Sequence, residues 1–215
     1  MSIDQSGLKS ISTGADVPLG GSRLVYILFA DLCSSTDFKA YCQAASIPDG
    51  VWIERQLIFL HRIITVVSRF EGRIVKTIGD EVMAYFPKEV EARQVLRCAT
   101  DCHSLFRDIA RYNNDQWRIS SRISIDYGRV YDANFGLVKD DTIDPVGIVV
   151  DRCARLNHEA VQNEVAFSSS VFALLPSDLQ SRYSKLRHEA ELKGIGKAEY
   201  YRIAIDNTPP EKGGA

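Results

Sequence analysis

Apolar runs and amphipathic stretches alternate along the first half of the chain. Residues 23–32 form a nearly continuous apolar run that predicts a strand ending near Asp31. Apolar residues then recur at helical spacing and predict a helix with one buried face; they are Ile53, Leu57, Leu60, Ile64 and Val67. Residues 73–87 contain two short apolar runs joined at Gly79-Asp80, a pattern typical of a β-hairpin. A second helical stripe follows, which we assign to the core; it comprises Ala92, Val95, Ala99, Cys102, Phe106 and Ile109.

The second half begins with a strict alternation of polar and apolar residues at 118–126, which predicts a strand with one apolar face. On its polar face, Arg122 and Asp126 fit the surface of an antiparallel sheet. Gly128 allows a turn or bulge before a further strand. From residue 148 the pattern is helical, and Asp151 and Arg155 lie one turn apart, a spacing typical of a modest surface salt bridge. A short strand, a helix and a final pair of strands follow; their sequences are VAFS, SSSVFALL, SKLRHEAEL and AEYYRIAI.

This order of elements, βαββαβ with an appended helix and C-terminal strands, predicts an α+β fold of the ferredoxin-like type. The helices are expected on one face of a mostly antiparallel sheet. Residues 1–22 are rich in Ser and Gly and lack periodicity, so we expect a flexible N-terminal lead. Residues 23–206 form the predicted domain, and residues 207–215 a disordered tail.

The composition is that of an average soluble protein, with 45% hydrophobic residues and a net charge of −2 over 215 residues. We therefore expect neither nucleic acid nor a membrane as a partner. No apolar run is long enough to span a bilayer, and the N-terminus lacks the apolar core of a signal peptide, which predicts a cytoplasmic protein. The five cysteines form no CxxC pair and are expected to be reduced, and the scattered histidines argue against a zinc site.

Two aspartates are the first candidates for chemistry. Asp31 follows the first strand and Asp80 lies in the hairpin turn. In a ferredoxin-like sheet the first and third strands are neighbours, so both carboxylates can reach the same end of the sheet. Facing carboxylates repel unless a cation lies between them, and Mg²⁺ and Mn²⁺ prefer oxygen ligands and bridge to phosphates. Taken alone, Asp80 is better explained as an ordinary turn residue.

Small and hydroxyl residues follow the first strand, in the segment CSSTDF, where a helical pattern begins. Backbone N–H groups of such a segment can bind an anion such as a phosphate group. On local grounds an ordinary N-cap by Ser35, Thr36 or Asp37 explains the segment better.

Five segments in order resemble the class III nucleotidyl cyclases; they are FADLCSST, VKTIGDEVMAYF, SRISIDYGRV, DPVGIVVDRCARL and LKGIGK, and together they extend from about residue 24 to residue 205. The resemblance implies a head-to-tail homodimer with its active sites at the interface. It also implies that Asp31 and Asp80 bind two Mn²⁺ or Mg²⁺ ions per site, with help from the backbone carbonyl of Leu32.

The resemblance implies the substrate-binding residues as well. Backbone groups of four consecutive residues would contact the triphosphate; these are Cys33, Ser34, Ser35 and Thr36. Arg122 matches an arginine that contacts phosphate, and Lys193 is a further candidate for a phosphate contact. From the other subunit, Lys76 and Asp144 match the positions that read the base. Arg155 matches the arginine that stabilises the transition state.

The implied reaction is attack of the ribose 3′-oxygen on the α-phosphorus of a nucleoside triphosphate, which releases pyrophosphate and forms a 3′,5′-cyclic nucleotide. Ser124 and Asp126 stand where the family usually has Gly and His. Asp151 stands at the catalytic position where a ribose-orienting Asn is common, and its carboxylate can still accept from a hydroxyl. These departures argue against the standard substrate geometry of an adenylate cyclase.

The base is the open question. Lys76 can donate to a ring acceptor and Asp144 can accept from an N–H group, which suits adenine, cytosine or uracil and excludes guanine better than it separates the other three. A stand-alone cyclase of this size with these substitutions is similar to the bacterial pyrimidine cyclases of the Pycsar antiphage system, which make cyclic UMP or cyclic CMP. We favour UTP as the substrate and expect a separate downstream effector protein that binds the cyclic nucleotide.

Three alternatives remain at the level of the sequence. One is an adenylate cyclase that makes cyclic AMP, and another is a catalytically degenerate cyclase fold that only binds a nucleotide or a partner. A relative of the diguanylate cyclases is the third, but the hairpin motif expected for it is absent, because the turn here has the sequence IGDEVM.

Overall fold

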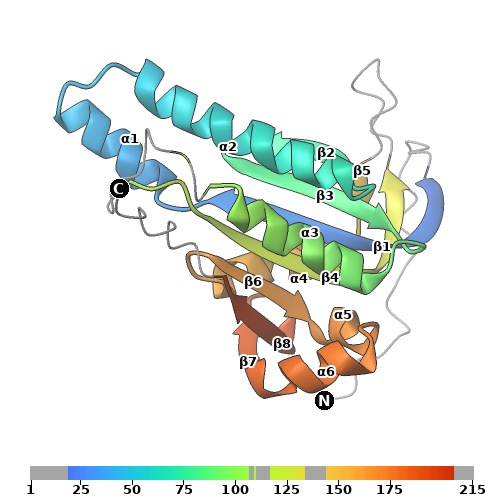
Figure 1. Cartoon of the computed structure of the whole chain (residues 1–215). Helices are drawn as coiled ribbons and strands as arrows, with labels where there is room; N and C mark the ends of the chain where they lie inside the picture. Colours follow the sequence, from blue (N-terminus) through green and yellow to red (C-terminus); the bar gives the residue numbers. More distant parts are fainter. Residues whose placement is uncertain (1–18, 107–108, 110–116, 134–143, 206–215) are drawn as a thin grey trace.

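Eight strands form one mixed sheet in the computed structural model, which describes residues 19–106, 109, 117–133 and 144–205 (Figure 1). Their bounds are β1 Leu19–Leu32, β2 Arg73–Ile78, β3 Glu81–Pro87, β4 Ser121–Ala133, β5 Asp144–Val146, β6 Glu164–Ser168, β7 Arg187–Leu192 and β8 Gly196–Ala204. The strand order is β2-β3-β1-β4-β6-β8-β7, and β5 pairs with β4. Paired strands are antiparallel except for β4 and β6, which are parallel.

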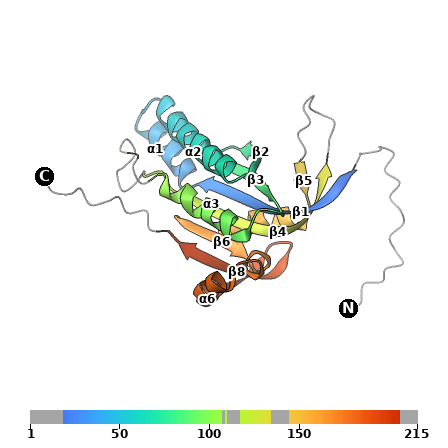
Figure 2. The same ribbon diagram turned by 45° about the vertical axis from the view of Figure 1, so that its right-hand side comes forward.

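The first four strands have the ferredoxin-like arrangement that the sequence predicts, with β1 between β3 and β4. Helices α1 (Ser35–Ala44), α2 (Gly50–Arg69) and α3 (Ala92–Ser104) lie together on one face of this sheet (Figure 2). The main core lies beneath them, where Leu28 of β1 packs with Phe59 of α2 and Val95 of α3. The α+β prediction and the core assignment of the second helical stripe are therefore confirmed.

The opposite face of the sheet is covered by α4 (Ile148–Glu159), so the prediction of helices on one face only is wrong (Figure 1). On this face Val149 and Cys153 of α4 join a second core cluster that includes Ile27 and Phe29 of β1. Burial of β1 on both faces explains why residues 23–32 form a nearly continuous apolar run.

β4 continues without interruption through Gly128, so the turn or bulge expected there is absent. Gly128 pairs with Val25 of β1, and a Cβ atom at this position would lie 3.3 Å from the Cβ of Val149 in α4. The glycine therefore lets the helix approach the sheet closely. Ser124 and Asp126 are fully buried beneath α4, so the prediction of a surface position for Asp126 is also wrong.

The C-terminal part extends the sheet with β6, β8 and β7. Helix α5 (Ser169–Ala173) is attached to β8 by the stacked rings of Phe172 and Tyr201, whose centroids are 4.0 Å apart. The sequence pattern did not indicate α6 (Ser177–Tyr183) or the 3₁₀ turn η3 (Ser184–Leu186), because both are short, neither has a fully buried residue, and in α6 only Leu179 and Tyr183 pack against the core.

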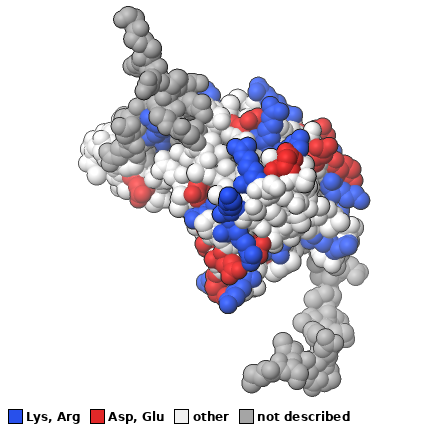
Figure 3. Space-filling view, turned by 60° about the horizontal axis from the view of Figure 1, so that its bottom comes forward, with Lys and Arg blue, Asp and Glu red and all other residues white. Residues whose placement is uncertain are grey.

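β1 begins at Leu19, four residues before the predicted start of the domain at residue 23. The remainder of the predicted lead and the predicted tail, 207–215, lie outside the described residues. All five cysteines are free, as predicted. Figure 3 shows cationic and anionic side chains on the same face of the molecule. None of the helices in the described part of the chain is long and apolar enough to cross a membrane.

Candidate active site

A pocket of about 560 Å³ opens at the end of β1, and both candidate metal ligands line it. Asp31 lies one residue before the end of β1, and Asp80 lies in the turn between β2 and β3. The side-chain amide of Gln56 in α2 donates to the carbonyl of Gly79 at 2.9 Å and holds this turn. Because β1 and β3 are neighbours, the two aspartates reach the same end of the sheet, as the strand order predicts.

Arg122 and Glu81 flank Asp31 on the two neighbouring strands, since Asp31 is paired with both in the sheet register. Arg122 contacts the Oδ2 atom of Asp31 through Nη2 at 2.6 Å and through Nε at 2.8 Å. Burial raises the pKa of Asp31, and Arg122 opposes that effect. Burial, together with the charges of Asp31 and Asp80, raises the pKa of Glu81 to about 7. Arg122 thus acts on both Asp31 and Glu81, and Asp80 adds a third carboxyl group at this end of the sheet.

This donor set fits a hard divalent cation, because it holds more carboxylate charge than Arg122 can neutralise. Within the described ranges, no three His, Cys, Asp or Glu side chains form a metal site by themselves. A magnesium-type site needs only one or two carboxylates, because substrate phosphates and water supply the remaining oxygens. Asp31, Asp80 and the carbonyl of Leu32 are the residues of this pocket that would hold the ions.

The segment that follows β1 forms another wall of the pocket, lined by Cys33, Ser34, Ser35, Thr36 and Asp37. Ser34 has a left-handed backbone with φ of 54°, and its carbonyl accepts the first N–H bond of α1, from Phe38 at 3.0 Å. Ser34 is therefore the N-cap, and an N-cap by Ser35, Thr36 or Asp37 is wrong. In the described part of the chain the Ser34 side chain makes no capping bond, so the first N–H groups of α1 remain open to an anion.

Arg55 supports this wall from behind. Its side chain is buried in α2, and its Nη2 atom donates to the carbonyl of Cys33 at 3.1 Å. The same guanidinium lies 3.4 Å from the carbonyls of Trp117 and Arg118, and over the ring of Phe38. Arg55 thus joins the candidate phosphate segment to the chain that leads into β4.

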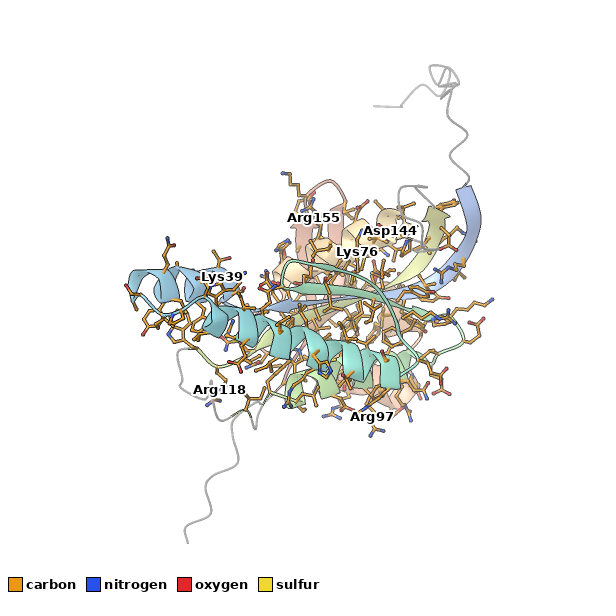
Figure 4. The ribbon with its side chains drawn as sticks, turned by 90° about the horizontal axis from the view of Figure 1, so that it is seen from above. Lys39, Lys76, Arg97, Arg118, Asp144 and Arg155 are labelled. Atoms are coloured by element: carbon orange, nitrogen blue, oxygen red, sulfur yellow. The ribbon has the colours of Figure 1, made fainter. Side chains whose placement is uncertain are left out.

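Lys76 and Asp144, the candidate base-reading residues, form an ion pair with each other. Lys76 is in β2 and Asp144 begins β5, so the pair joins elements 68 positions apart in sequence. In Figure 4, these two residues and Arg155 of α4 lie on the same side of the molecule. None of the three is among the residues that line the pocket. One chain therefore carries the candidate metal residues and the candidate base residues in two separate places.

Helix α4 presents a stripe of exposed residues on its outer side; these are Ile148, Asp151, Arg155 and His158. The predicted salt bridge between Asp151 and Arg155 is wrong, since no ion pair joins them in the described structure. Their side chains are instead both directed away from the sheet. Lys193 is exposed in the turn between β7 and β8, next to Leu192, which packs against Leu156 of α4. Lys193 lies outside the pocket.

The sequence did not indicate two polar residues that line the pocket, His158 and Gln162, nor Glu81, which pairs with Asp31 in the sheet register. Glu81 could have been found, because it follows Asp80 directly and the hairpin register places it opposite Asp31. His158 could have been found from its helical spacing, three residues after Arg155. Gln162 lies in the connection between α4 and β6, where no periodic pattern indicates its direction.

Comparisons with known proteins identify the family and the fold that carry this pocket. Residues 19–205 match the family model described as the adenylate and guanylate cyclase catalytic domain. Among solved structures, the chain is similar to the guanylyl cyclase Cya2, with a TM-score of 0.73 and 17% identity over 91% of this chain and 97% of that one. It is similar to the adenylyl cyclase CyaB from P. aeruginosa, with a TM-score of 0.69 and 16% identity over 86% and 96%.

A third similar structure is the guanylate cyclase domain of RhGC from Catenaria anguillulae in complex with GTP, with a TM-score of 0.66 and 18% identity over 87% of this chain and 100% of that one. At these identities the likeness shows the fold. A search of curated protein sequences found no match. The family match over residues 19–205 shows that the chain belongs to the adenylate and guanylate cyclase catalytic domains, the class III nucleotidyl cyclases.

Proposed function

We propose that this nucleotidyl cyclase acts as a homodimer and converts UTP into cyclic UMP and pyrophosphate. The observation that carries the proposal is the separation of two residue sets on one chain. Asp31 and Asp80 line the pocket, whereas Lys76 and Asp144 pair with each other outside it. A second copy, placed head to tail, would supply its Lys76–Asp144 pair and its Arg155 to this pocket.

Class III cyclases use divalent metal ions, and here the proposed ions are Mn²⁺ or Mg²⁺, two per site. When bound, they would lower the pKa of the ribose 3′-hydroxyl and offset the charge of the triphosphate. The open N–H groups at the start of α1 and the guanidinium of Arg122 would bind phosphate oxygens. The N–H groups are fixed by the backbone of Ser34 and by Arg55, so they need no rearrangement when the substrate arrives.

In the reaction, a bond forms between the 3′-oxygen and the α-phosphorus while the bond from that phosphorus to the leaving pyrophosphate breaks. The 3′-proton passes to water. Negative charge on the phosphoryl oxygens is offset by Arg155 of the second copy, whose exposed side chain has no ion-pair partner within the described residues. Asp151, one turn earlier on the same helix, would accept a hydrogen bond from the ribose.

Base selection falls to Lys76 and Asp144. An ammonium group and a carboxylate held together offer donors beside an acceptor, which matches a uracil carbonyl beside its N3–H group. The same pair fits cytosine N3 and N4 or adenine N1 and N6, so CTP and ATP are the competing substrates. The departures at Ser124, Asp126 and Asp151 argue against the standard substrate geometry of an adenylate cyclase, and the resemblance to the pyrimidine cyclases favours a pyrimidine. Cyclic UMP would then act as an antiphage second messenger through a separate effector protein.

A direct test is to incubate the purified chain with Mn²⁺ and, separately, with ATP, GTP, CTP or UTP, and to identify products by mass spectrometry. We expect cyclic UMP in excess over the other cyclic nucleotides, and no product from an Asp80→Ala variant. Cyclic AMP as the main product would overturn the base assignment and leave the cyclase assignment in place. A complete lack of cyclic product, with nucleotide binding retained, would identify a catalytically degenerate domain.

A further inference from the structure

A buried ion pair on the inner side of α4 takes no part in the proposed chemistry. Arg152 donates through Nε to Oδ2 of Asp126 at 2.6 Å and through Nη2 to Oδ1 at 3.0 Å. The side chain of Asp126 is 0% exposed, whereas that of Arg152 is 26% exposed. The same carboxylate accepts the backbone N–H of Tyr127 at 2.7 Å. Because a guanidinium is planar, these two parallel bonds fix the direction of Arg152 as well as its position.

Other polar contacts hold α4 at further points along its length. The hydroxyl of Ser124 donates to the carbonyl of Cys153 at 2.8 Å, and the side-chain amide of Asn157 donates to the carbonyl of Phe29 at 3.2 Å. Ser124 and Asp126 are the two β4 positions at which this chain departs from the family pattern. Both side chains bond to α4, so the two departures share one structural effect, which is to attach α4 to β4.

The outer side of the same helix carries Asp151 and Arg155, and Arg152 lies between them in sequence. Any rotation of α4 about its axis moves these exposed side chains. At an outer radius of about 5–6 Å, a rotation of about 10° displaces an atom by about 1 Å. A displacement of about 1 Å at a reacting centre can cost about 100-fold in rate. The rate of the reaction therefore depends on how α4 is rotated about its axis.

We propose that the Asp126–Arg152 pair positions α4, so that Arg155 is directed at the reacting phosphate in the partner's pocket. The inference rests on the proposed function of Arg155. Net stability does not explain the pair well, since a buried ion pair contributes little more than apolar residues of the same size. Its two-bond geometry is suited to fixing an orientation. Asp126 and Arg152 are positioning residues and touch no substrate.

The first experiment compares steady-state kinetics and thermal unfolding of three variants. Asp126→Asn keeps the acceptor for Tyr127 but breaks the two-bond pair, and we expect kcat to fall between about tenfold and about 100-fold with KM within about threefold. Asp126→Asn combined with Arg152→Gln leaves no unpaired buried charge, so Tm should recover while kcat stays low. Val95→Ala, in the core on the other face of the sheet, is the control that lowers Tm and leaves kcat unchanged.

The second experiment places Asp126→Asn in an Arg155→Ala background, where it should lower kcat by less than about twofold if it acts through Arg155. An equally large fall in both backgrounds, or recovery of kcat together with Tm in the paired variant, would overturn the proposal.

Hydrogen exchange across residues 148–159 provides a readout that needs no activity. Asp126→Asn should speed this exchange relative to Val95→Ala, and equal exchange would also refute the positioning role. If Arg155→Ala is fully active, or if no cyclic nucleotide forms at all, the proposed function is wrong. The hydrogen-exchange measurement then decides by itself whether the Asp126–Arg152 pair holds α4.

Discussion

Acidification should weaken this fold through one buried histidine, His103 of α3. Its Nε2 atom lies 3.1 Å from the carbonyl of Glu164 in β6, and its Nδ1 atom lies 2.9 Å from the hydroxyl of Ser121 in β4. A carbonyl can only accept, so Nε2 carries the proton and Nδ1 accepts from Ser121. The ring is therefore neutral in the folded state. It holds the beginning of β4, one residue before Arg122.

Burial lowers the pKa of His103 from 6.5 to about 4. Between these pH values the unfolded chain binds a proton that the folded chain does not. The free energy of unfolding therefore decreases as pH falls. The contribution is fully present above about pH 6.5 and is lost progressively toward about pH 4. At about 1.4 kcal/mol per pKa unit, the loss is about 3 kcal/mol of unfolding free energy.

The assay is urea unfolding of the wild type and of His103→Gln between about pH 7.5 and about pH 4.5. The comparison is needed because Glu81, whose pKa is raised to about 7, acts in the opposite direction and favours the folded state as pH falls. Glu81 is present in both proteins, so its effect cancels in the difference. We expect the stability advantage of the wild type to shrink by about 2–3 kcal/mol across this range. A difference that stays constant with pH would show that His103 is not the group whose protonation destabilises the fold.

Three further predictions concern the site and its supports. Arg155→Ala should lower kcat by about 10²–10³ with little change in KM, measured by steady-state kinetics, and an equal rise in KM would contradict a role confined to the transition state. Gly128→Val should cost about 1–3 kcal/mol in urea unfolding, because its side chain would collide with Val149, and unchanged stability would contradict the close approach of α4. Arg55→Met should raise KM as well as lower stability by about 1–3 kcal/mol, because the carbonyl of Cys33 loses a donor; a stability loss alone would show that Arg55 does not shape the phosphate segment.

Much of the fold follows from local patterns in the sequence. The hairpin at Gly79-Asp80 and the stripe that includes Val95 depend on residues close together in the chain, and both were predicted correctly. The same patterns could not show which face of the sheet α4 covers. Residues 118–126 show the same alternation of polar and apolar residues whether the polar face meets water or a helix with matching polar groups. Asp126 was therefore assigned to the surface, and its partner Arg152 was missed.

The candidate site shows the same limit. Asp31 and Asp80 could be brought together from the strand order alone, because register and neighbouring strands determine where strand ends lie. Placing the third carboxyl group, that of Glu81, beside Asp31 required the residue-by-residue register of β1 with β3. That Asp151 and Arg155 both face away from the sheet depends on the rotation of α4, which is set by contacts to β4 that are distant in sequence.

We propose that each active site combines residues from two copies of the chain. Lys76→Ala and Asp80→Ala should each be inactive alone, because one removes the base contact and the other a metal ligand from both sites of a homodimer. After the two variants are mixed and their subunits exchange, half of the dimers contain one site free of both changes, so about a quarter of wild-type activity should return. Activity that stays at the level of the separate variants, although mixed dimers are shown to form, would show that the two copies do not share their active sites.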